Sequence, residues 1–276
     1  MTIDSHQHFW HYELPKHEWI DDEMAAIRRD FTPEDLRPIL DTNGVDGCIA
    51  VQADQTLVET DFLLGLAAKH EWIRGVVGWI DLRSEQLNDD LDRYTGQKKL
   101  VGFRHVVQGE PDPLFLLREN FLRGIEAIGK RGYTYDILIF PHQLVSALEL
   151  VKLFPSVKFV VDHLAKPYAK AGYFTGWAAG MEALAKLPNV HCKLSGLITE
   201  ADYQNWTEAE LLPYLEHALN CFGPDRCMFG SDWPVCRVAG NYGRVKGLLA
   251  SAVECLSAEE KSGIWGRNAL KFYGLG

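Results

Sequence analysis

Two histidines separated by one residue stand near the start of the chain, and their spacing is suited to chemistry. His6 and His8 lie within Ile3-Asp-Ser-His-Gln-His-Phe-Trp10, a short run with the pattern of a β-strand. Because side chains alternate between the faces of a strand, both imidazoles would point the same way, with Cα atoms about 7 Å apart. Imidazole binds zinc-like metals and titrates near neutral pH. The pair predicts a metal-binding or proton-transferring site; two ordinary polar residues at a strand end are the alternative.

Two further residues of the same chemical kind follow later apolar runs. His163 ends Phe159-Val-Val-Asp-His163, and Asp232 lies in Met228-Phe-Gly-Ser-Asp232-Trp-Pro234. Taken singly, His163 could be a core histidine bonded to a carbonyl, and Asp232 a turn-forming residue. A carboxylate beside imidazoles, however, serves as a metal ligand or as a proton acceptor. We therefore expect the two to join His6 and His8 in one site.

The elements that must position these residues are short apolar runs alternating with helical patterns. Eight candidate strands span Ile3–Trp10, Gly47–Gln52, Ile73–Asp81, Leu100–Val107, Tyr135–Phe140, Val157–Asp162, Val190–Leu194 and Cys227–Gly230. The candidate helices include Glu59–His70, Leu114–Lys130, Gln143–Phe154, Trp177–Leu187 and Thr207–Phe222. Eight strand–helix units within 276 residues favour the α/β class and a single (β/α)8 TIM-like barrel over residues 1–276. A doubly wound open sheet is the alternative, but no nucleotide-binding glycine motif follows any candidate strand.

Other polar and aromatic residues also fall at the carboxyl ends of the candidate strands, where such barrels carry their working face. Arg104 and His105 are neighbours in a strand, so only one can face the lumen. An inward Arg104 would hold an anionic or oxygen-rich substrate, or an oxyanion. Lys193 would bind substrate or pair with a carboxylate. Trp79 and Trp233 would pack against a sugar ring or seal the core.

The composition excludes several classes of partner. Lys and Arg number 28 against 38 Asp and Glu, a formal net charge of −10, which argues against nucleic acid or an anionic membrane as partner. The sequence has no apolar run long enough to span a bilayer. The N-terminus lacks the basic and apolar regions of a secretory signal. We expect a cytoplasmic protein with a small-molecule substrate, and a homodimer is a further expectation.

The order of these residues resembles that of the amidohydrolase superfamily, in particular its amidohydrolase-2-like branch of sugar-lactone hydrolases. The matching stretches run across the chain: Ile3–Trp10, Gly102-Phe-Arg-His105, Val161-Asp-His-Leu-Ala-Lys-Pro167, Lys193-Leu-Ser-Gly196, Phe229-Gly-Ser-Asp-Trp-Pro-Val235, Asn268-Ala269 and Phe272-Tyr273-Gly274. The resemblance implies a distorted (β/α)8 barrel that hydrolyses a small cyclic ester. Aldonolactones of deoxysugars, such as L-fucono- or L-rhamnono-lactone, are the leading class.

The sequence departs from the two-metal members of that superfamily. Those members bridge their metals with a modified lysine or a glutamate from a middle strand. Here the fourth and fifth candidate strands end in Arg104-His105 and Phe140-Pro141-His142, which supply neither residue. The resemblance then implies at most one divalent metal, zinc being the leading candidate, and it extends to relatives that use no metal.

Two versions of the reaction follow from the resemblance. With one metal, His6, His8 and Asp232, together with His163, would hold or approach the ion, whose water attacks the lactone carbonyl. Asp232 would take the proton and pass it to the departing ring oxygen, while His163 or Arg104 would stabilise the oxyanion. Without metal, Asp232 and the histidines would activate water directly.

Three alternatives stay open at this point. The same barrel could hydrolyse a dicarboxylate lactone or decarboxylate an aromatic acid, although only Arg104, Lys166 and Lys193 would supply positive charge at the strand ends. A non-catalytic sugar-binding or metal-binding barrel would keep the aromatic residues. Such a barrel would have no need for an aspartate beside paired histidines, so the sequence favours the lactonase.

Overall fold

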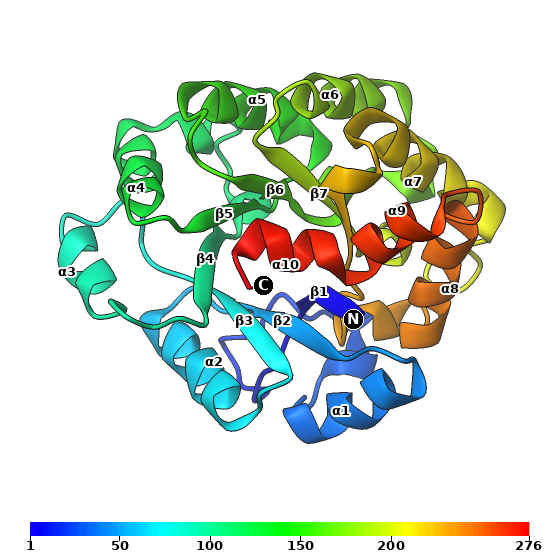
Figure 1. Ribbon diagram of the computed structural model, residues 1–276, viewed down its shortest axis with the longest axis horizontal. Coiled ribbons are helices and arrows are strands. Elements are labelled where there is room, and N and C mark those ends of the chain that lie inside the picture. The colour runs from blue at the N-terminus through cyan, green and yellow to red at the C-terminus, as the bar shows by residue number, and fades with distance from the viewer. Residues whose placement is uncertain (276) are drawn as a thin grey trace.

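A cylinder of eight parallel strands forms the centre of the computed structural model, which describes residues 1–275 (Figure 1). The strands are β1 (Ile3–Gln7), β2 (Gly47–Val51), β3 (Ile73–Gly78), β4 (Leu100–His105), β5 (Thr134–Ile137), β6 (Phe159–Val161), β7 (Val190–Leu194) and β8 (Cys227–Phe229). Each strand pairs in parallel with the next one along the chain. The predicted (β/α)8 barrel is confirmed.

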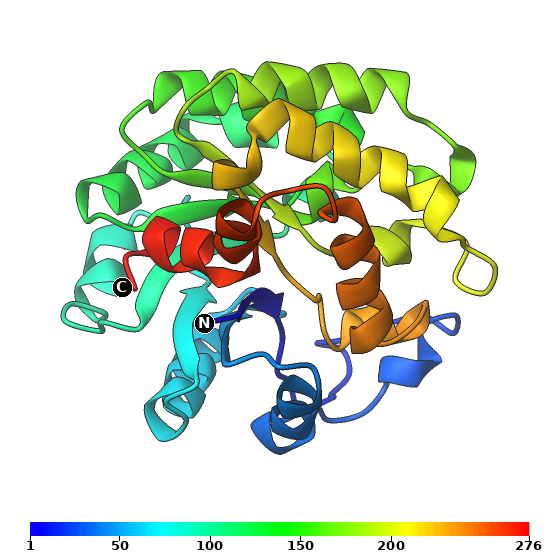
Figure 2. The same ribbon diagram turned by 45° about the vertical axis from the view of Figure 1, so that its right-hand side comes forward.

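Helices surround the cylinder, as the two views show (Figures 1 and 2). They are α1 (Pro33–Thr42), α2 (Leu57–Lys69), α3 (Leu87–Asp92), α4 (Glu119–Lys130), α5 (Leu144–Leu153), α6 (Thr175–Ala185), α7 (Glu208–Phe222), α8 (Tyr242–Ala252), α9 (Ala258–Ser262) and α10 (Asn268–Tyr273). Capping boxes begin three of them, at Thr32, Thr207 and Ser257, where a hydroxyl and a carboxylate satisfy backbone N–H groups that have no partner inside the helix. None of the helices within residues 1–275 is both long enough and apolar enough to span a membrane.

The first and last strands meet at their carboxyl ends. The amide of Asp232, just beyond β8, donates to the carbonyl of His6 at 2.8 Å, and the amide of His8 donates to the carbonyl of Trp233 at 2.7 Å. Beneath these bonds the buried carboxylate of Asp4 accepts from the amide of Ser231 at 2.9 Å and from its hydroxyl at 2.5 Å. We call this junction, formed by residues 4–8 and 231–233, the closure seam.

Several predicted boundaries differ from the structure. The first strand ends at Gln7 rather than Trp10, because Trp10 leaves the barrel and exchanges backbone hydrogen bonds with Phe31. The helix predicted over 114–130 is wrong in its first turn: a short 3₁₀ turn precedes Arg118, which is extended, and α4 begins at Glu119. The break allows the ring of Phe115 to be fully buried.

The end of the barrel where the strands begin is closed by the C-terminal helix. Helix α10 lies across this end, and the N-terminus lies beside it (Figure 1). A separate apolar cluster joins α10 to the strands, formed by Ile3, Ile49, Val51, Val77, Val101, Val160, Met228, Ala269, Phe272 and Tyr273. The opposite end, at the carboxyl ends of the strands, carries a pocket lined by His8, His163 and Asp232.

Replacing Phe272 by Ala should therefore destabilise the whole barrel. The ring is 2% exposed within this cluster, and deletion of a buried aromatic side chain costs about 3–5 kcal/mol. Urea denaturation should show this loss, whereas the exposed neighbour Lys271, replaced by Ala, should leave the midpoint almost unchanged. Equal midpoints for the two variants would contradict the closing role of α10.

Candidate active site

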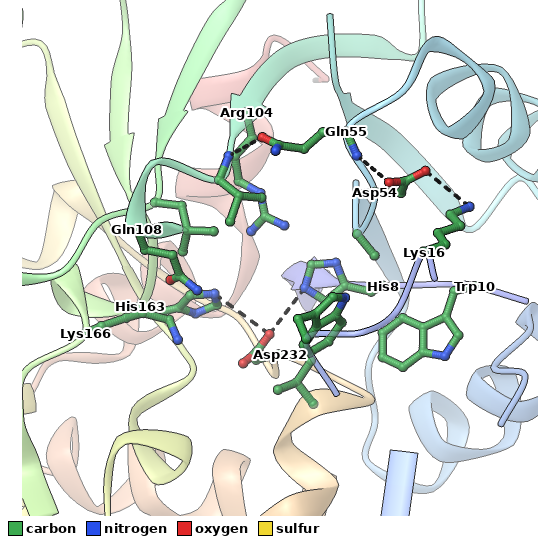
Figure 3. Close-up of a pocket in the computed structure, with 15 residues that line it drawn as sticks. His8, Trp10, Lys16, Asp54, Gln55, Arg104, Gln108, His163, Lys166 and Asp232 are labelled. Atoms are coloured by element: carbon green, nitrogen blue, oxygen red, sulfur yellow. Dashed lines mark hydrogen bonds and ion pairs between the residues drawn. The ribbon is translucent and has the colours of Figure 1, made fainter. Parts of the chain in front are cut away.

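A pocket of about 290 Å³ opens at the carboxyl ends of the strands. Figure 3 shows His8, Asp232 and His163 at its centre, with His8 and His163 on either side of the carboxylate. The residues that line the pocket come from loops that follow most of the strands: His8, Trp10, Lys16, Trp19, Ala53, Asp54, Gln55, Arg104, Val106, Gln108, Leu138, His163, Lys166, Asp232 and Val235. The strand ends thus converge on one pocket, as a parallel barrel requires.

The structure brings together the four residues that the sequence suggested as metal ligands. His6 Nε2 lies 3.2 Å from His8 Nε2, so the two imidazoles do share one face of β1. His8 Nε2 lies 3.3 Å from Asp232 Oδ1, and His163 Nε2 lies 3.8 Å from the same oxygen. All four side chains are buried.

Backbone conformation aims two of these side chains. Asp232 has φ of +55°, in the left-handed region that a non-glycine residue adopts uncommonly, and aspartate is among the residues that tolerate it best. The hydrogen bond from its amide to His6 holds it there. His163 has φ of +53° and turns off β6 toward Asp232. The strained backbone conformations thus occur at two residues whose side chains could take part in a reaction.

Hydrogen bonds fix which ring nitrogens carry lone pairs. His8 Nδ1 lies 2.8 Å from the carbonyl of Val51, which can only accept, so Nδ1 carries the proton and Nε2 presents a lone pair. Arg104 Nη1 lies 3.1 Å from His6 Nε2 and must donate to it. Neither Nε2 atom therefore has a hydrogen to offer the other across their 3.2 Å separation.

This arrangement fits a small cation. Two ligands of a tetrahedral zinc ion, each about 2.0–2.1 Å from the metal, lie about 3.3 Å apart, and the His6–His8 and His8–Asp232 separations are 3.2 and 3.3 Å. An ion bound here would take the His6 Nε2 lone pair from Arg104. His6, His8 and Asp232 form the group best placed for this, with His163 farther away.

The pKa shifts of the His6, His163 and Asp232 side chains also favour binding of a metal ion. Burial, together with Lys193 and Arg104, lowers the pKa of His6 well below its usual range, and burial does the same for His163. Burial acts to raise the pKa of the Asp232 carboxyl, but the His163 and His8 side chains beside it hold the pKa below its ordinary value. Near neutral pH, His6 and His163 are thus neutral imidazoles and Asp232 is a carboxylate, the forms in which these groups bind metals.

A network of buried charges lies beneath His6. Asp162 Oδ2 accepts from Arg104 at 3.1 Å, and Asp162 Oδ1 lies 3.0 Å from Lys193 Nζ and 3.3 Å from His6 Nδ1. Lys193 also donates to Asp136 at 2.5 Å, and the hydroxyl of Tyr273 donates to the same carboxylate at 2.8 Å. Two cations facing two carboxylates satisfy the charge balance that burial demands.

Four residues that the sequence suggested as substrate contacts do not line the pocket. Arg104 faces the lumen, and His105 therefore points outward, where it contacts Glu110 at 2.7 Å and Trp79 at 3.3 Å. Trp233 is 1% exposed and packs on Phe31, which seals the core. Lys193 is fully buried and takes the alternative role of pairing with carboxylates.

Other residues of the site escaped the sequence reasoning. Trp19, from the long loop after β1, is 43% exposed and forms part of the pocket wall, and Lys16 lines the pocket from the same loop. Asp162 carried a signal, because it is an acid that ends a buried apolar strand directly before His163. The loop residues carried none, since nothing in their spacing ties them to a strand end.

Removing the charge of Asp162 should destabilise the protein strongly. In Asp162→Asn, Arg104 and Lys193 lose a buried counter-charge, and breaking such an arrangement costs about 3–5 kcal/mol. Asp41→Asn is the matched control, since it breaks an exposed pair with Arg37 whose contribution is at most about 1 kcal/mol. The two variants should differ clearly in their free energies of unfolding in urea. Similar values would contradict the role given to Asp162.

The chain is similar over its whole length to known proteins. An L-fucono-1,5-lactonase from Burkholderia multivorans (strain ATCC 17616 / 249) is 41% identical over 287 residues, covering 100% of this chain and 96% of the relative. A second protein of that name, from Burkholderia ambifaria, is 35% identical over 276 residues, covering 98% of this chain and 94% of the relative. The crystal structure of an amidohydrolase from Burkholderia multivorans with bound zinc superimposes with a TM-score of 0.97 at 40% identity, over the full length of both chains. The model of the family described as amidohydrolase matches residues 3–275, and the chain belongs to that family.

Proposed function

We propose that this protein is a hydrolase that opens a small sugar lactone, with L-fucono-1,5-lactone as the leading substrate. One observation carries the proposal: His6, His8, His163 and Asp232 converge at one pocket, and a carboxylate beside imidazoles can accept a proton from an attacking water. The full-length similarity to proteins named L-fucono-1,5-lactonase supports the substrate class. The small-molecule partner follows from it, and a cytoplasmic location and a homodimer stay predictions from the sequence.

The walls of the pocket suit a sugar ring. Trp19, Leu138 and Val235 supply apolar surface, against which the C–H groups of a deoxysugar would lie. Gln55 and Gln108 supply amide groups that hydrogen-bond hydroxyls. A lactone that presents one face of C–H groups and several hydroxyls matches this division.

The reaction follows from the state of Asp232. As a carboxylate within the pocket, it takes a proton from the water that attacks the lactone carbonyl carbon. The tetrahedral intermediate then collapses, the bond to the ring oxygen breaks, and that oxygen takes the proton from Asp232. His163, held by Ser195 at 2.9 Å, stands on the far side of Asp232 from His8, with its Nε2 3.8 Å from the carboxylate.

We propose that His6, His8 and Asp232, approached by His163, hold one zinc ion. When bound, zinc lowers the pKa of its water to about 7 and polarises a carbonyl. The chain's own residues orient the ligands: Val51 holds the ring of His8, and the Asp162–Lys193 pair lies against Nδ1 of His6. The spacing of the ligand atoms supports this assignment.

A dicarboxylate substrate is less compatible with the charges. Of the cations that the sequence offered for it, Lys193 is fully buried, and the Nη donors of Arg104 are taken by Asp162, His6 and Gln52. Lys166 is the remaining one at the pocket, and it offers a single positive charge. Two carboxylates would need more positive charge than this.

Asp232→Asn should abolish most of the hydrolysis without unfolding the protein. Asparagine tolerates the positive φ of this position, so the closure seam should persist. Loss of a general base lowers kcat by about 10²–10⁴-fold. The measurement is proton release from L-fucono-1,5-lactone, followed with a pH indicator.

A matched control is Asp81→Asn, which changes an aspartate just beyond β3 that pairs with Arg83 away from the pocket. The control should keep the wild-type rate. A folded Asp232→Asn variant with unchanged turnover would show that Asp232 is not the base.

Chelation tests the metal assignment separately. Prolonged dialysis against a strong chelator should stop hydrolysis, and zinc added back should restore it, because the ion supplies the activated water. Circular dichroism of the chelated protein should stay native, since the barrel closes through backbone bonds. Hydrolysis that is indifferent to chelator would leave the lactonase in place and assign water activation to Asp232 and the histidines alone.

A further inference from the structure

A turn in the left-handed backbone conformation follows β6. His163, Leu164, Ala165 and Lys166 have φ of +53°, +54°, +55° and +48°, so four consecutive residues other than glycine are left-handed. This conformation costs about 1–2 kcal/mol per residue for L-amino acids. Such strain persists only where the surroundings enforce it, and it gathers at functional sites.

The surroundings of the turn do enforce it. Leu164 and Ala165 are fully buried, and the indole of Trp177 donates to the carbonyl of Leu164 at 2.6 Å. The amide of Lys166 donates to the carbonyl of His163 at 2.8 Å. The turn places both of its ends, His163 and Lys166, on the wall of the same pocket. A right-handed or extended backbone over these four residues would not place His163 and Lys166 together on the pocket wall.

Arg104, which the sequence suggested as a residue that stabilises an oxyanion, uses its Nη donors in hydrogen bonds within the protein. A guanidinium has five N–H donors, and the two Nη atoms of Arg104 bond Asp162, His6 and both oxygens of Gln52. Its remaining donor, Nε, is buried and has no partner within residues 1–275. Arg104 is 4% exposed, so even the one Nη1 hydrogen that an ion on His6 Nε2 would release has little access to a substrate.

Lys166 has N–H donors that no protein group accepts from within residues 1–275. Its ammonium carries three N–H groups, and one of them meets Glu200 at 2.7 Å. The side chain is 16% exposed and lies on the His163 side of Asp232 (Figure 3). Lys16, the other pocket lysine, lies beyond His8 and already faces two carboxylates, Glu59 at 3.2 Å and Asp54 at 3.6 Å.

We propose that Lys166 is a catalytic residue that binds the reacting oxygen of the substrate. Its ammonium donates to the lactone carbonyl oxygen as water adds to the carbon and the oxygen becomes anionic. When the ring oxygen leaves with the proton from Asp232, the same N–H group holds the product carboxylate. Glu200 is a positioning residue that keeps the ammonium at the pocket wall.

This inference rests on the proposed hydrolysis of a lactone for its catalytic part only. An anion-binding ammonium beside Asp232 makes a second prediction that needs no turnover, namely affinity for the aldonate product. Lys166 and Asp232 line the same pocket; burial raises the pKa of the Asp232 carboxyl, whereas His163, His8 and, to a smaller extent, Lys166 lower it. The two side chains therefore act on the same small volume of the pocket.

The test compares Lys166→Met and Lys166→Arg with the wild type, all loaded with zinc. Methionine keeps an unbranched side chain one atom shorter than lysine and removes the charge, whereas arginine keeps the charge. Lys170→Met is the matched control, because Lys170 is an exposed lysine close by in the same segment that does not line the pocket.

The expected result is a fall in kcat of about 100-fold or more in Lys166→Met, as for loss of an oxyanion donor, with a smaller change in KM. Lys166→Arg should recover part of this loss, and Lys170→Met should match the wild type. Titration calorimetry with L-fuconate should show affinity lowered about tenfold or more in Lys166→Met, because a charged hydrogen bond is lost.

Wild-type kcat and wild-type affinity for L-fuconate in folded Lys166→Met would overturn the inference. If the wild type opens no lactone, the proposed function fails, yet weaker L-fuconate binding in Lys166→Met would still support Lys166 as the anion site. If Lys166→Met does not fold, Lys166→Gln and Glu200→Gln take its place, and full activity in both would count against the inference.

Discussion

The meeting of the first and last strands is the constraint on which the rest of the structure depends. Two backbone hydrogen bonds join them, from Asp232 to His6 and from His8 to Trp233. The same residues carry the imidazoles and the carboxylate, so the bonds that close the barrel also set the distances within the site. The carboxylate of Asp4 reinforces this junction from below by accepting from the amide and hydroxyl of Ser231. Because backbone bonds of this kind leave little freedom, the site is held in place before any ligand arrives.

The barrel interior beneath the seam is unusually polar for a core. Lys193, Asp136 and Asp162 are fully buried, and Arg104 is 4% exposed. Burial raises the pKa of Asp136 to about 6, although Lys193 opposes this, whereas at Asp162 burial is outweighed by Lys193 and Arg104 and the pKa is lowered. Such a network is tolerated because its cations and carboxylates pair. It supports the ring of His6 from one side and leaves Lys166, outside the network, as the pocket cation on the His163 side of Asp232.

The sequence was sufficient for the barrel and for the four residues around the proposed ion. His6 and His8 obey strand alternation, and His163 and Asp232 end apolar runs, so their convergence follows from topology. The sequence could not choose between Arg104 and His105, because strand alternation leaves open which face is inward. It also left open whether Trp79 and Trp233 contact a ligand or seal the core, since an aromatic residue beside a strand end packs equally well against a helix or a ligand. The wall contributed by Trp19 depends on the path of a long loop, which has no periodic pattern.

The central claim is that this pocket opens a sugar lactone, and a substrate panel tests it most directly. Initial rates of proton release would be measured with the zinc-loaded protein on deoxysugar aldonolactones of five- and six-membered rings, on their non-deoxy counterparts and on a dicarboxylate lactone. We predict the highest kcat/KM for L-fucono-1,5-lactone, weaker activity on other sugar lactones and none on the dicarboxylate. Hydrolysis of the dicarboxylate lactone alone, or of no lactone at all, would contradict the account.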